Sequence, residues 1–253
     1  MVTAHLTIGL GNNLFQIAAA LAASVVDNDT CIFPTWEYDK AFSVPADMLV
    51  NDITSPNNVT YHEPHFHYSP IPSAGGNTLA LDGYFQSEKY FSNIAERTRD
   101  LFSPSLYVKT RLREYEKMLS PLVSIHVRRG DYLNLQQFHP VQPLDYYILA
   151  ISRFRSDQKF MIFSDDIPWC KTAFGSLPNP ERFLYPALHT DYMDLHMMSM
   201  CHAGHIIANS SFSWWGAWLD SSLSPVYAPR NWFGPSFSCN DTKDLIPDRW
   251  NIL

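Results

Sequence analysis

The stretch VSIHVRRGDY, residues 123–132, joins a short apolar run to two adjacent arginines in a chain that is otherwise acidic. The run predicts a buried strand over 122–127 that enters a turn at Gly130, where glycine allows the chain to bend. In open α/β sheets, ligands bind beyond this end of the strands. The arginines therefore suggest an anion site.

Two other interpretations of this stretch remain open. If the strand persists, Arg128 and Arg129 point to opposite faces, so only one of them reaches a given phosphate. A fixed guanidinium fork suits a diphosphate, and each charge-assisted hydrogen bond contributes about 1.5–3 kcal/mol. The alternatives are a surface arginine pair with Asp131 as its salt-bridge partner, and an Arg-Gly-Asp adhesion tripeptide, a triplet that is common by chance.

The composition is that of a globular protein. The 253 residues include 46% hydrophobic and 17% charged residues, enough apolar material for one large or two small domains. The formal net charge of −7 argues against general nucleic-acid binding, which usually needs a basic face. Recognition of a phosphate must then come from a local basic site.

The first residues, MVTAHLTIGLGNNLF, contain neither a basic n-region nor a long apolar segment. They predict no signal peptide and no transmembrane segment, hence a cytoplasmic location, with attachment to a membrane surface if the acceptor is lipid-linked. The four cysteines show no paired spacing of the kind that zinc sites use, which predicts reduced thiols.

From residue 122 onward, strands alternate with helices, which predicts βαβ units and a parallel sheet. The predicted strands are 122–127, 160–164, 182–185, 205–208 and 226–228, and the predicted helices are 144–155, 167–174, 191–202 and 212–222.

The chain before residue 122 predicts a second, less regular α/β half. Its expected elements are a strand at 5–8, a glycine turn, a helix at 12–26, a strand at 30–33, and helices at 88–102 and 105–119. Residues 34–79 are rich in Pro, Asn, Ser and His and predict loops. We therefore expect two domains, 1–118 and 119–253, with a binding cleft between them.

Two further segments offer helix N-termini to an anion. Gly9-Leu10-Gly11-Asn12-Asn13-Leu14 resembles a phosphate-binding turn, although Leu14 replaces the third glycine of the dinucleotide fingerprint. Asp29 lies about 20 residues further on, where the acidic residue of that fingerprint is expected, so binding of a nicotinamide cofactor stays open. The other alternative is a plain turn. In the segment 206–215, Ser210 and Ser211 can cap a helix and also offer their hydroxyl groups to an anion. The alternative is that they only cap the helix, with Trp214 and Trp215 in the core.

Carboxylates and histidines elsewhere do not predict a metal site. Asp165 and Asp166 end a strand, where they would bind a sugar hydroxyl or cap the next helix. The run 27–29 matches a D-x-D pattern, but Asp and Asn are ordinary turn residues at such a place. The histidines of 61–67 surround a proline, which favours a loop over a metal site.

With these segments in place, the chain resembles glycosyltransferase family 11, the α-1,2-fucosyltransferases. The matching segments run in order along nearly the whole chain, and HVRRGDY followed by ANSSFSWWGAWL is the most specific combination. They are GLGNNLFQ at 9–16, DGYFQSEKYF at 82–91, HVRRGDY at 126–132, LDYY at 144–147, FSDDIPWCK at 163–171, DLHMMSMCHAGHIIANSSFSWWGAWL at 194–219 and APRNWF at 228–233.

The resemblance implies an α/β, GT-B-like fold with two Rossmann-like halves facing a cleft. It also implies GDP-β-L-fucose as the donor, inversion at the anomeric carbon, no cofactor and no metal. By the same resemblance the C-terminal half binds GDP, and the N-terminal half contributes to the acceptor side. The default acceptor is the 2-hydroxyl of a β-galactoside, so the expected partners are a sugar nucleotide and a glycan.

The resemblance also assigns roles to residues. His126, Arg128 and Arg129 would face the diphosphate, with Arg129 at the β-phosphate. Asp194 would contact the guanosine and Asn12 the sugar. The remaining donor-binding candidates are Asp165, Asn209, Ser210, Ser211 and Phe212.

The catalytic candidates are Arg129, His126 and Asp131, and the base that accepts the acceptor's proton is left open. Asp131 is the nearest carboxylate, but it would equally orient Arg129. Some related fucosyltransferases carry a glutamate where this chain has Gln136. Two other functions stay open: transfer from a different GDP-sugar, and a binding module without turnover.

Overall fold

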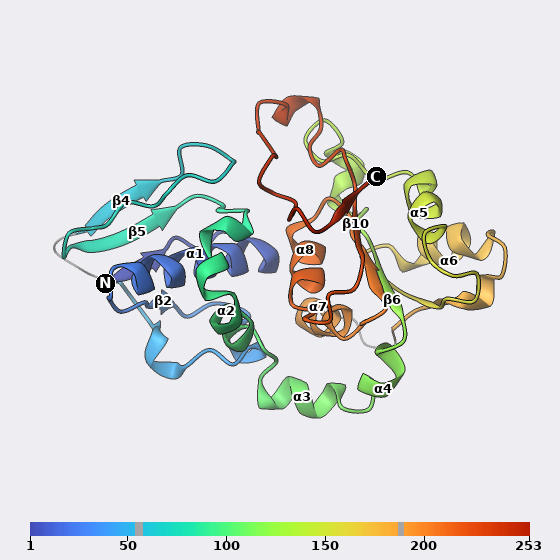
Figure 1. The fold of residues 1–253 in the computed structure, drawn as a ribbon, viewed down its shortest axis with the longest axis horizontal. Coiled ribbons are helices and arrows are strands. Elements are labelled where there is room, and N and C mark those ends of the chain that lie inside the picture. The colour runs from blue at the N-terminus through green and yellow to red at the C-terminus, as the bar shows by residue number, and fades with distance from the viewer. Residues whose placement is uncertain (54–57, 187–189) are drawn as a thin grey trace. The chain divides into compact units, whose positions relative to one another are not determined.

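The computed structural model describes residues 1–53, 58–186 and 190–253, which form two compact units. The first unit comprises Met1–Thr110 with Asn240–Pro247, and the second comprises Arg111–Cys239 with Asp248–Leu253 (Figure 1). The division lies before the expected boundary near residue 118. The segment 240–247 belongs to the first unit because Asp244 accepts hydrogen bonds from the Tyr68 amide and the Lys89 ammonium group.

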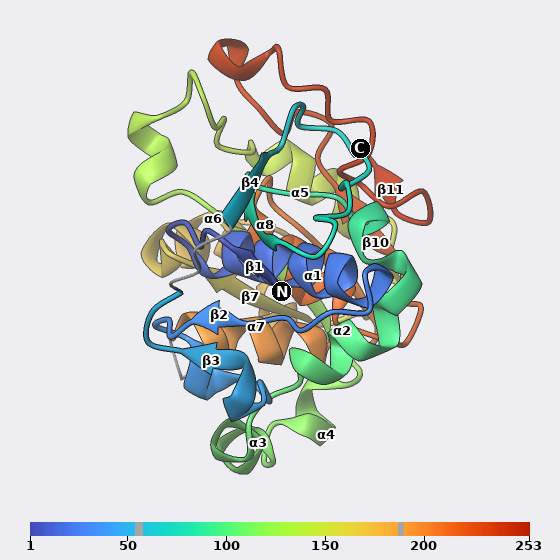
Figure 2. The ribbon, with the colours of Figure 1, turned by 90° about the vertical axis from the view of Figure 1, so that its left-hand side faces the viewer.

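The first unit has a parallel sheet in the order β1-β5-β4 and a small pair, β2-β3. Its strands are β1 (Val2–Ala4), β2 (Phe33–Pro34), β3 (Leu49–Val50), β4 (Asn58–His62) and β5 (Thr78–Asp82). Its helices are α1 (Leu10–Val26), α2 (Ala95–Leu101) and α3 (Leu106–Leu112), of which α3 runs across the division between the units. Figure 2 looks onto this unit and shows α1 between β4 and the β2-β3 pair.

Two expectations for this unit are wrong. The strand expected at 5–8 is instead β1, and the following residues form the loop into α1, where the Thr7 amide donates to the Gln16 side chain. Within the loop region expected at 34–79, β3, β4 and the start of β5 are strands, while residues 54–57 lie outside the described part. The sequence does not reveal β4 because its side chains are largely exposed and show no apolar alternation.

The second unit is a six-stranded parallel sheet in the order β11-β10-β9-β6-β7-β8. Its strands are β6 (Val123–Val127), β7 (Phe160–Ser164), β8 (Phe183–Leu184), β9 (Gly204–Ile206), β10 (Val226–Ala228) and β11 (Asn251–Ile252). Its helices are α4 (Glu116–Leu119), α5 (Leu144–Ile151), α6 (Ile167–Gly175), α7 (Asp191–Ser199) and α8 (Ser211–Trp218). The expected alternation is confirmed, and only the edge strand β11 was not expected.

The chain order of this sheet creates a topological switch point. The chain runs outward from β6 to β7 and β8, and then returns to β9 on the other side of β6. Figure 1 shows α5 and α6 on one face of the sheet and α7 and α8 on the other. Ligands of open α/β sheets bind at such a point, beyond the carboxyl ends of the strands.

Strand β6 is buried on both faces, and successive side chains along it point to opposite faces of the sheet. Val123, Ile125 and Val127 pack in one core cluster with Tyr147 and Phe174 from α5 and α6. Ser124 and His126 have the opposite parity and therefore face the α7–α8 side. None of the helices in the described ranges has the length and hydropathy needed to cross a bilayer.

Helices α7 and α8 pack closely because Gly216 has no side chain. A Cβ atom at this position would lie 2.8 Å from Cε and 3.0 Å from Cβ of Met198. We expect Gly216→Ala to destabilise the second unit by about 1 kcal/mol or more, since overpacking outweighs alanine's better helix propensity. Urea unfolding measures the change. Gly175→Ala is the control, because no described atom lies within 4 Å of a Cβ there, and an equal loss in that variant would contradict the explanation.

Candidate functional site

The second unit brings most of the predicted site residues to one edge of its sheet. Arg128 and Arg129 follow β6, Asp165 follows β7, and Asn209 and Ser210 follow β9. These three strands are adjacent and parallel, with β6 in the middle, so their carboxyl ends meet at the switch point. The structure therefore gathers residues that are far apart in the sequence.

Arg129 is held in one orientation by two contacts. Its Nε donates to Asp166 Oδ2 over 3.0 Å, and its guanidinium carbon lies 4.1 Å from the centroid of the Trp169 ring. Only 16% of the side chain is exposed. Asp166 binds through Nε, and the aromatic ring covers one face of the guanidinium plane. In this geometry the two terminal Nη groups of Arg129 have a fixed orientation in which they can donate hydrogen bonds to an anion.

Arg128 has different partners, as expected for a neighbour of opposite parity. Its Nη2 pairs with Asp131 Oδ1 over 2.7 Å, and its Nη1 pairs with Asp165 Oδ2 over 3.1 Å. The alternative in which Asp131 orients Arg129 is therefore wrong for this structure. Asp131 is the salt-bridge partner of Arg128, which corresponds in part to the surface-pair interpretation.

Asp165 connects the two arginines rather than standing apart to bind a sugar hydroxyl. Its Oδ1 accepts the backbone N–H of Arg129 over 2.9 Å, while Oδ2 pairs with Arg128. The approach requires Gly130, because a Cβ atom there would lie 2.6 Å from Asp165 Oδ2. Asp165 therefore fixes the turn that carries both guanidinium groups.

Three carboxylates, those of Asp131, Asp165 and Asp166, thus pair with two guanidinium groups. The arginine pair is not a patch of excess positive charge. The arginine pair can bind an anion because neighbouring carboxylates hold its N–H groups in fixed directions. Asp166 also accepts the Trp169 amide as the N-cap of α6, so the capping role expected for it is confirmed.

His126 lies in β6 with 5% of its surface exposed, and its ring centroid is 5.1 Å from that of Phe212. Burial, reinforced by the positive charge of Arg128, lowers the pKa of His126 to about 3. The imidazole is therefore neutral at physiological pH and adds no cation to the site. Its buried Nδ1 has no hydrogen-bond partner within the described ranges.

The N-terminus of α8 faces the same edge. Ser210 occupies the N-cap position, yet its side chain makes no capping hydrogen bond, contrary to the capping alternative. Ser211 and Phe212 begin the helix and are partly exposed, and Trp214 and Trp215 are buried as expected. The first N–H groups of a helix and its dipole favour an anion here.

Asn209 is a structural residue in this site. Its Nδ2 donates to the carbonyl oxygens of Pro140 and Trp232, both over 3.0 Å, and its Oδ1 accepts from Gln142. With 1% of its surface exposed, its amide is committed to holding neighbouring loops. The donor-binding role predicted for its side chain is therefore not available in this geometry.

Residues that the sequence did not single out complete the site. The Tyr132 hydroxyl donates to the Asn209 carbonyl over 3.1 Å, and the Gln142 amide bridges Asn209 and the Asn231 carbonyl. Trp169 supports Arg129. Tyr132 and Trp169 lie inside the segments that match the family, and this match was the only sequence indication of their roles. Their partners come from distant parts of the chain, so local spacing could not reveal them.

Asp194 lies in the first turn of α7, which packs against α8. Burial, together with the negative charge of Asp191, raises the pKa of Asp194 to about 7. A carboxyl group in this condition gains and loses a proton near neutral pH, so a ligand that donates hydrogen bonds to it favours its ionised form.

Asn12 belongs to the first unit, whereas the other predicted residues belong to the second. Its Oδ1 accepts from Gln86 over 2.9 Å, and its Nδ2 donates to the Ile8 carbonyl. The preceding turn needs glycine, because Gly9 has φ +101°. The helix begins at Leu10 rather than near Asn12, so the turn is shorter than expected.

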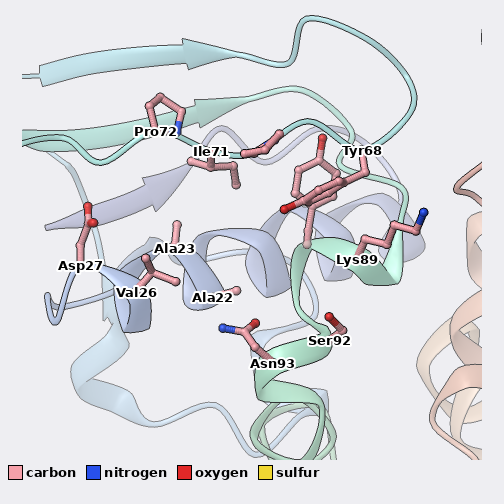
Figure 3. A pocket seen from close by; sticks show the side chains of 12 residues that line it. Ala22, Ala23, Val26, Asp27, Tyr68, Ile71, Pro72, Lys89, Ser92 and Asn93 are labelled. Atoms are coloured by element: carbon pink, nitrogen blue, oxygen red, sulfur yellow. The ribbon is translucent and has the colours of Figure 1, made fainter.

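The first unit also contains a pocket of about 400 Å³ on α1, which includes none of the predicted residues. Figure 3 shows Asp27 and Lys89 at opposite ends of it, with Tyr68 and Ile71 above the helix. Among the described residues, no group of three His, Cys, Asp or Glu side chains is arranged to hold a metal ion.

The chain is similar in sequence to known glycosyltransferases. Residues 39–253 match Glycosyl transferase family 11. The chain is 32% identical to the O-antigen biosynthesis glycosyltransferase WbnK of Escherichia coli over 69% of its own length, and it spans 60% of that protein. It is 29% identical to an Escherichia coli α-1,2-colitosyltransferase, covering 99% of this chain and 98% of the relative. A galactoside 2-α-L-fucosyltransferase of Caenorhabditis elegans is 25% identical over 90% of this chain and 71% of that protein.

Solved structures with the same fold include the α-1,6-fucosyltransferase NodZ soaked with GDP-fucose, with a TM-score of 0.59, 14% identity, and coverage of 86% of this chain and 91% of that one. A point mutant of Arabidopsis thaliana FUT1 in complex with GDP has a TM-score of 0.56 and 14% identity, with coverage of 97% of this chain and 74% of that one. The expected α/β fold of the GT-B type is confirmed.

Proposed function

Because the chain belongs to glycosyltransferase family 11, we propose that it is an inverting α-1,2-fucosyltransferase. It would move L-fucose from GDP-β-L-fucose to the 2-hydroxyl of a β-galactoside, without a metal ion. The second unit would bind the donor and the first unit the acceptor. Relatives that are galactoside 2-α-L-fucosyltransferases support the linkage and the acceptor class.

The fixed geometry of Arg129 is the observation that carries this proposal. Breaking the C1–O bond of fucose leaves extra negative charge on the β-phosphate of GDP. A cation that is already oriented stabilises this charge in the transition state without reorganising. Asp166 and Trp169 hold Arg129 in this way, and the α8 N-terminus offers N–H groups to the same diphosphate.

The remaining donor contacts follow from position and chemistry. The unpaired Nδ1 of His126 would bind a donor oxygen or nitrogen as a neutral group. Ser210, Ser211 and Phe212 would line the pyrophosphate and fucose. Asp194 would accept hydrogen bonds from the guanine edge, which would favour its ionised form.

A second donor deserves a direct test, because one relative that matches along almost the whole chain is an α-1,2-colitosyltransferase. The second candidate function is therefore transfer of another sugar from its GDP derivative. It keeps the same arginines and the same diphosphate site, and differs only in the pocket around the sugar ring.

A donor-and-acceptor screen tests both functions. We expect GDP-fucose to be consumed with a β-galactoside acceptor, with equal rates in the presence and absence of EDTA, and NMR of the product to show an α-1,2 linkage. Faster turnover of GDP-colitose would favour the second function. Binding of GDP without turnover of either donor would identify a binding module.

A further inference from the structure

We infer that the pocket on α1 in the first unit is a binding site for an uncharged saccharide. The inference rests on the proposed function, which gives the protein a glycan as substrate. The pocket has a volume of about 400 Å³, within the range of small-molecule sites, and the first unit supplies all of its lining residues. It is separate from Asn12, because α1 rises by about 15 Å between Asn12 and Ala22.

The cavity exists because α1 carries small side chains where it faces another segment. Ala22 and Ala23, from the alanine-rich part of the helix, line one side of the pocket. Figure 3 shows Ile71 and Pro72 above the helix, on the segment that lines the opposite side. Pro70 and Pro72 fix the backbone on either side of Ile71. An alanine side chain ends at its Cβ atom, so the space beneath Ile71 stays open for a ligand.

Carboxylates hold both ends of this segment, residues 68–74. The Tyr68 amide donates to Asp244 Oδ2 over 3.1 Å, and the Ala74 amide donates to Asp27 Oδ2 over 3.3 Å. Asp27 is the C-cap residue of α1, so its hydrogen bond ties the segment directly to the helix. The pocket is therefore formed before a ligand arrives, which lowers the entropy cost of binding.

The apolar part of the lining suits the C–H face of a sugar ring. The Tyr68 ring packs edge-on against Tyr90, with ring centroids 4.9 Å apart. Tyr90 is buried, and its hydroxyl donates to Glu63 and accepts the Ser69 amide, so it is a fixed support. The Tyr68 ring is thereby held in one position, where it supplies a large apolar contact area with a polar tip.

Polar groups surround this apolar part. Asp27 and Lys89 lie at opposite ends of the pocket, and Ser92 and Asn93 also line it (Figure 3). Together they offer a carboxylate, an ammonium group, a hydroxyl group and an amide, which include both donors and acceptors of hydrogen bonds. The hydroxyl groups of a sugar need this combination, because each of them both donates and accepts.

The charged groups of the lining already have partners, which favours an uncharged ligand. The Lys89 ammonium group lies 2.5 Å from Asp244 Oδ1, and the Asp27 carboxylate accepts the Ala74 amide. An anion would lose its hydration without gaining an unpaired cation from Lys89, and a cation at Asp27 would share the pocket with Lys89. A saccharide satisfies both ends without a charge of its own.

NMR of the isotope-labelled full chain tests the site, with lactose as the probe and no GDP-fucose present. We expect lactose to shift the amide signals of Ile71, Lys89 and Asn93 saturably, and glycerol at equal concentration to leave them unchanged. Ala23→Phe, which fills the pocket, should abolish these shifts. Tyr68→Ala should weaken lactose binding about tenfold, because it removes the ring that packs on the sugar.

The matched control is Val25→Phe, on the same helix. Val25 is exposed and does not line the pocket, so this variant should respond to lactose as the wild type does. GDP binding should be unchanged in all three variants, because the pocket contains none of the residues predicted to bind the donor. If Ala23→Phe fails to fold, Tyr68→Ala decides the test.

Three results would overturn the site while leaving the proposed function intact. They are the absence of saturable shifts at these amides in the wild type, an equal response to glycerol, and shifts that persist unchanged in both Ala23→Phe and Tyr68→Ala. The proposed function fails separately: a wild-type protein that binds lactose in the pocket but transfers no sugar would overturn the proposed function and keep the saccharide site.

Discussion

Arg129→Ala is expected to lower kcat for fucosyl transfer by about 1,000-fold, the size of effect seen when a pre-oriented charge-stabilising donor is removed. The variant loses the guanidinium group that would meet the β-phosphate as the leaving group gains charge. It should still fold, because its partners, Asp166 and Trp169, lie at the rim of the sheet, and Asp166 keeps its capping hydrogen bond from the Trp169 amide.

Arg129→Lys separates charge from geometry. Lysine keeps a positive charge but lacks the planar fork that bonds Asp166 through Nε while covering the Trp169 ring. We therefore expect most of the loss in kcat to persist in this variant. The assay is transfer from GDP-fucose under saturating donor, with circular dichroism to verify folding.

The matched control is Arg155→Ala, which removes an exposed arginine that pairs only locally, with Asp157. It should transfer fucose at the wild-type rate. Near-normal kcat in Arg129→Ala would contradict the role assigned to Arg129.

Asp220→Asn is expected to reduce the free energy of unfolding of the second unit by about 1–3 kcal/mol or more, because it removes the charged acceptor of a buried hydrogen-bond network. The Asp220 side chain is 1% exposed, and its Oδ2 lies 3.0 Å from Nε2 of the fully buried His205. His205 Nδ1 in turn lies 2.7 Å from Ser124 Oγ on β6. The network therefore ties the α8–β10 connection to the central strand of the site.

Hydrogen bonds also determine how this stability depends on pH. Burial alone would raise the pKa of Asp220, but the hydrogen bonds from His205 and Ser222 outweigh burial and hold that pKa well below its usual range. Its stabilising contribution is fully present above the unfolded-state pKa of about 3.9. As the pH falls through the lower folded-state pKa, the contribution is lost.

Urea unfolding at several pH values, followed by tryptophan fluorescence, measures both effects. Every tryptophan except Trp36 lies in the second unit, so the signal reports mainly on that unit. The difference between wild type and Asp220→Asn should be largest near pH 7 and shrink below about pH 4. Asp157→Asn, in an exposed pair, should leave unfolding unchanged. An equal effect of both variants would refute the buried-network explanation.

The sequence by itself determined the architecture of the second unit. Its strands are short apolar runs separated by helix-length segments, and burial on both faces of a parallel sheet produces this pattern directly. The strand 160–164 and the strand 226–228 match β7 and β10. The first unit was harder to predict because β4 is exposed and β1 is only three residues long, so neither shows a periodic signal.

For the candidate site, the sequence located Arg128, Arg129 and the helix start at Ser210, since charged and small polar residues that follow apolar strands mark the ligand-binding edge. Only the tertiary structure decided their partners. It assigned Asp131 to Arg128, Asp166 and Trp169 to Arg129, and the Asn209 amide to loop packing. Such pairings depend on which strands are neighbours, and strand order arises from packing of the whole sheet rather than from local sequence.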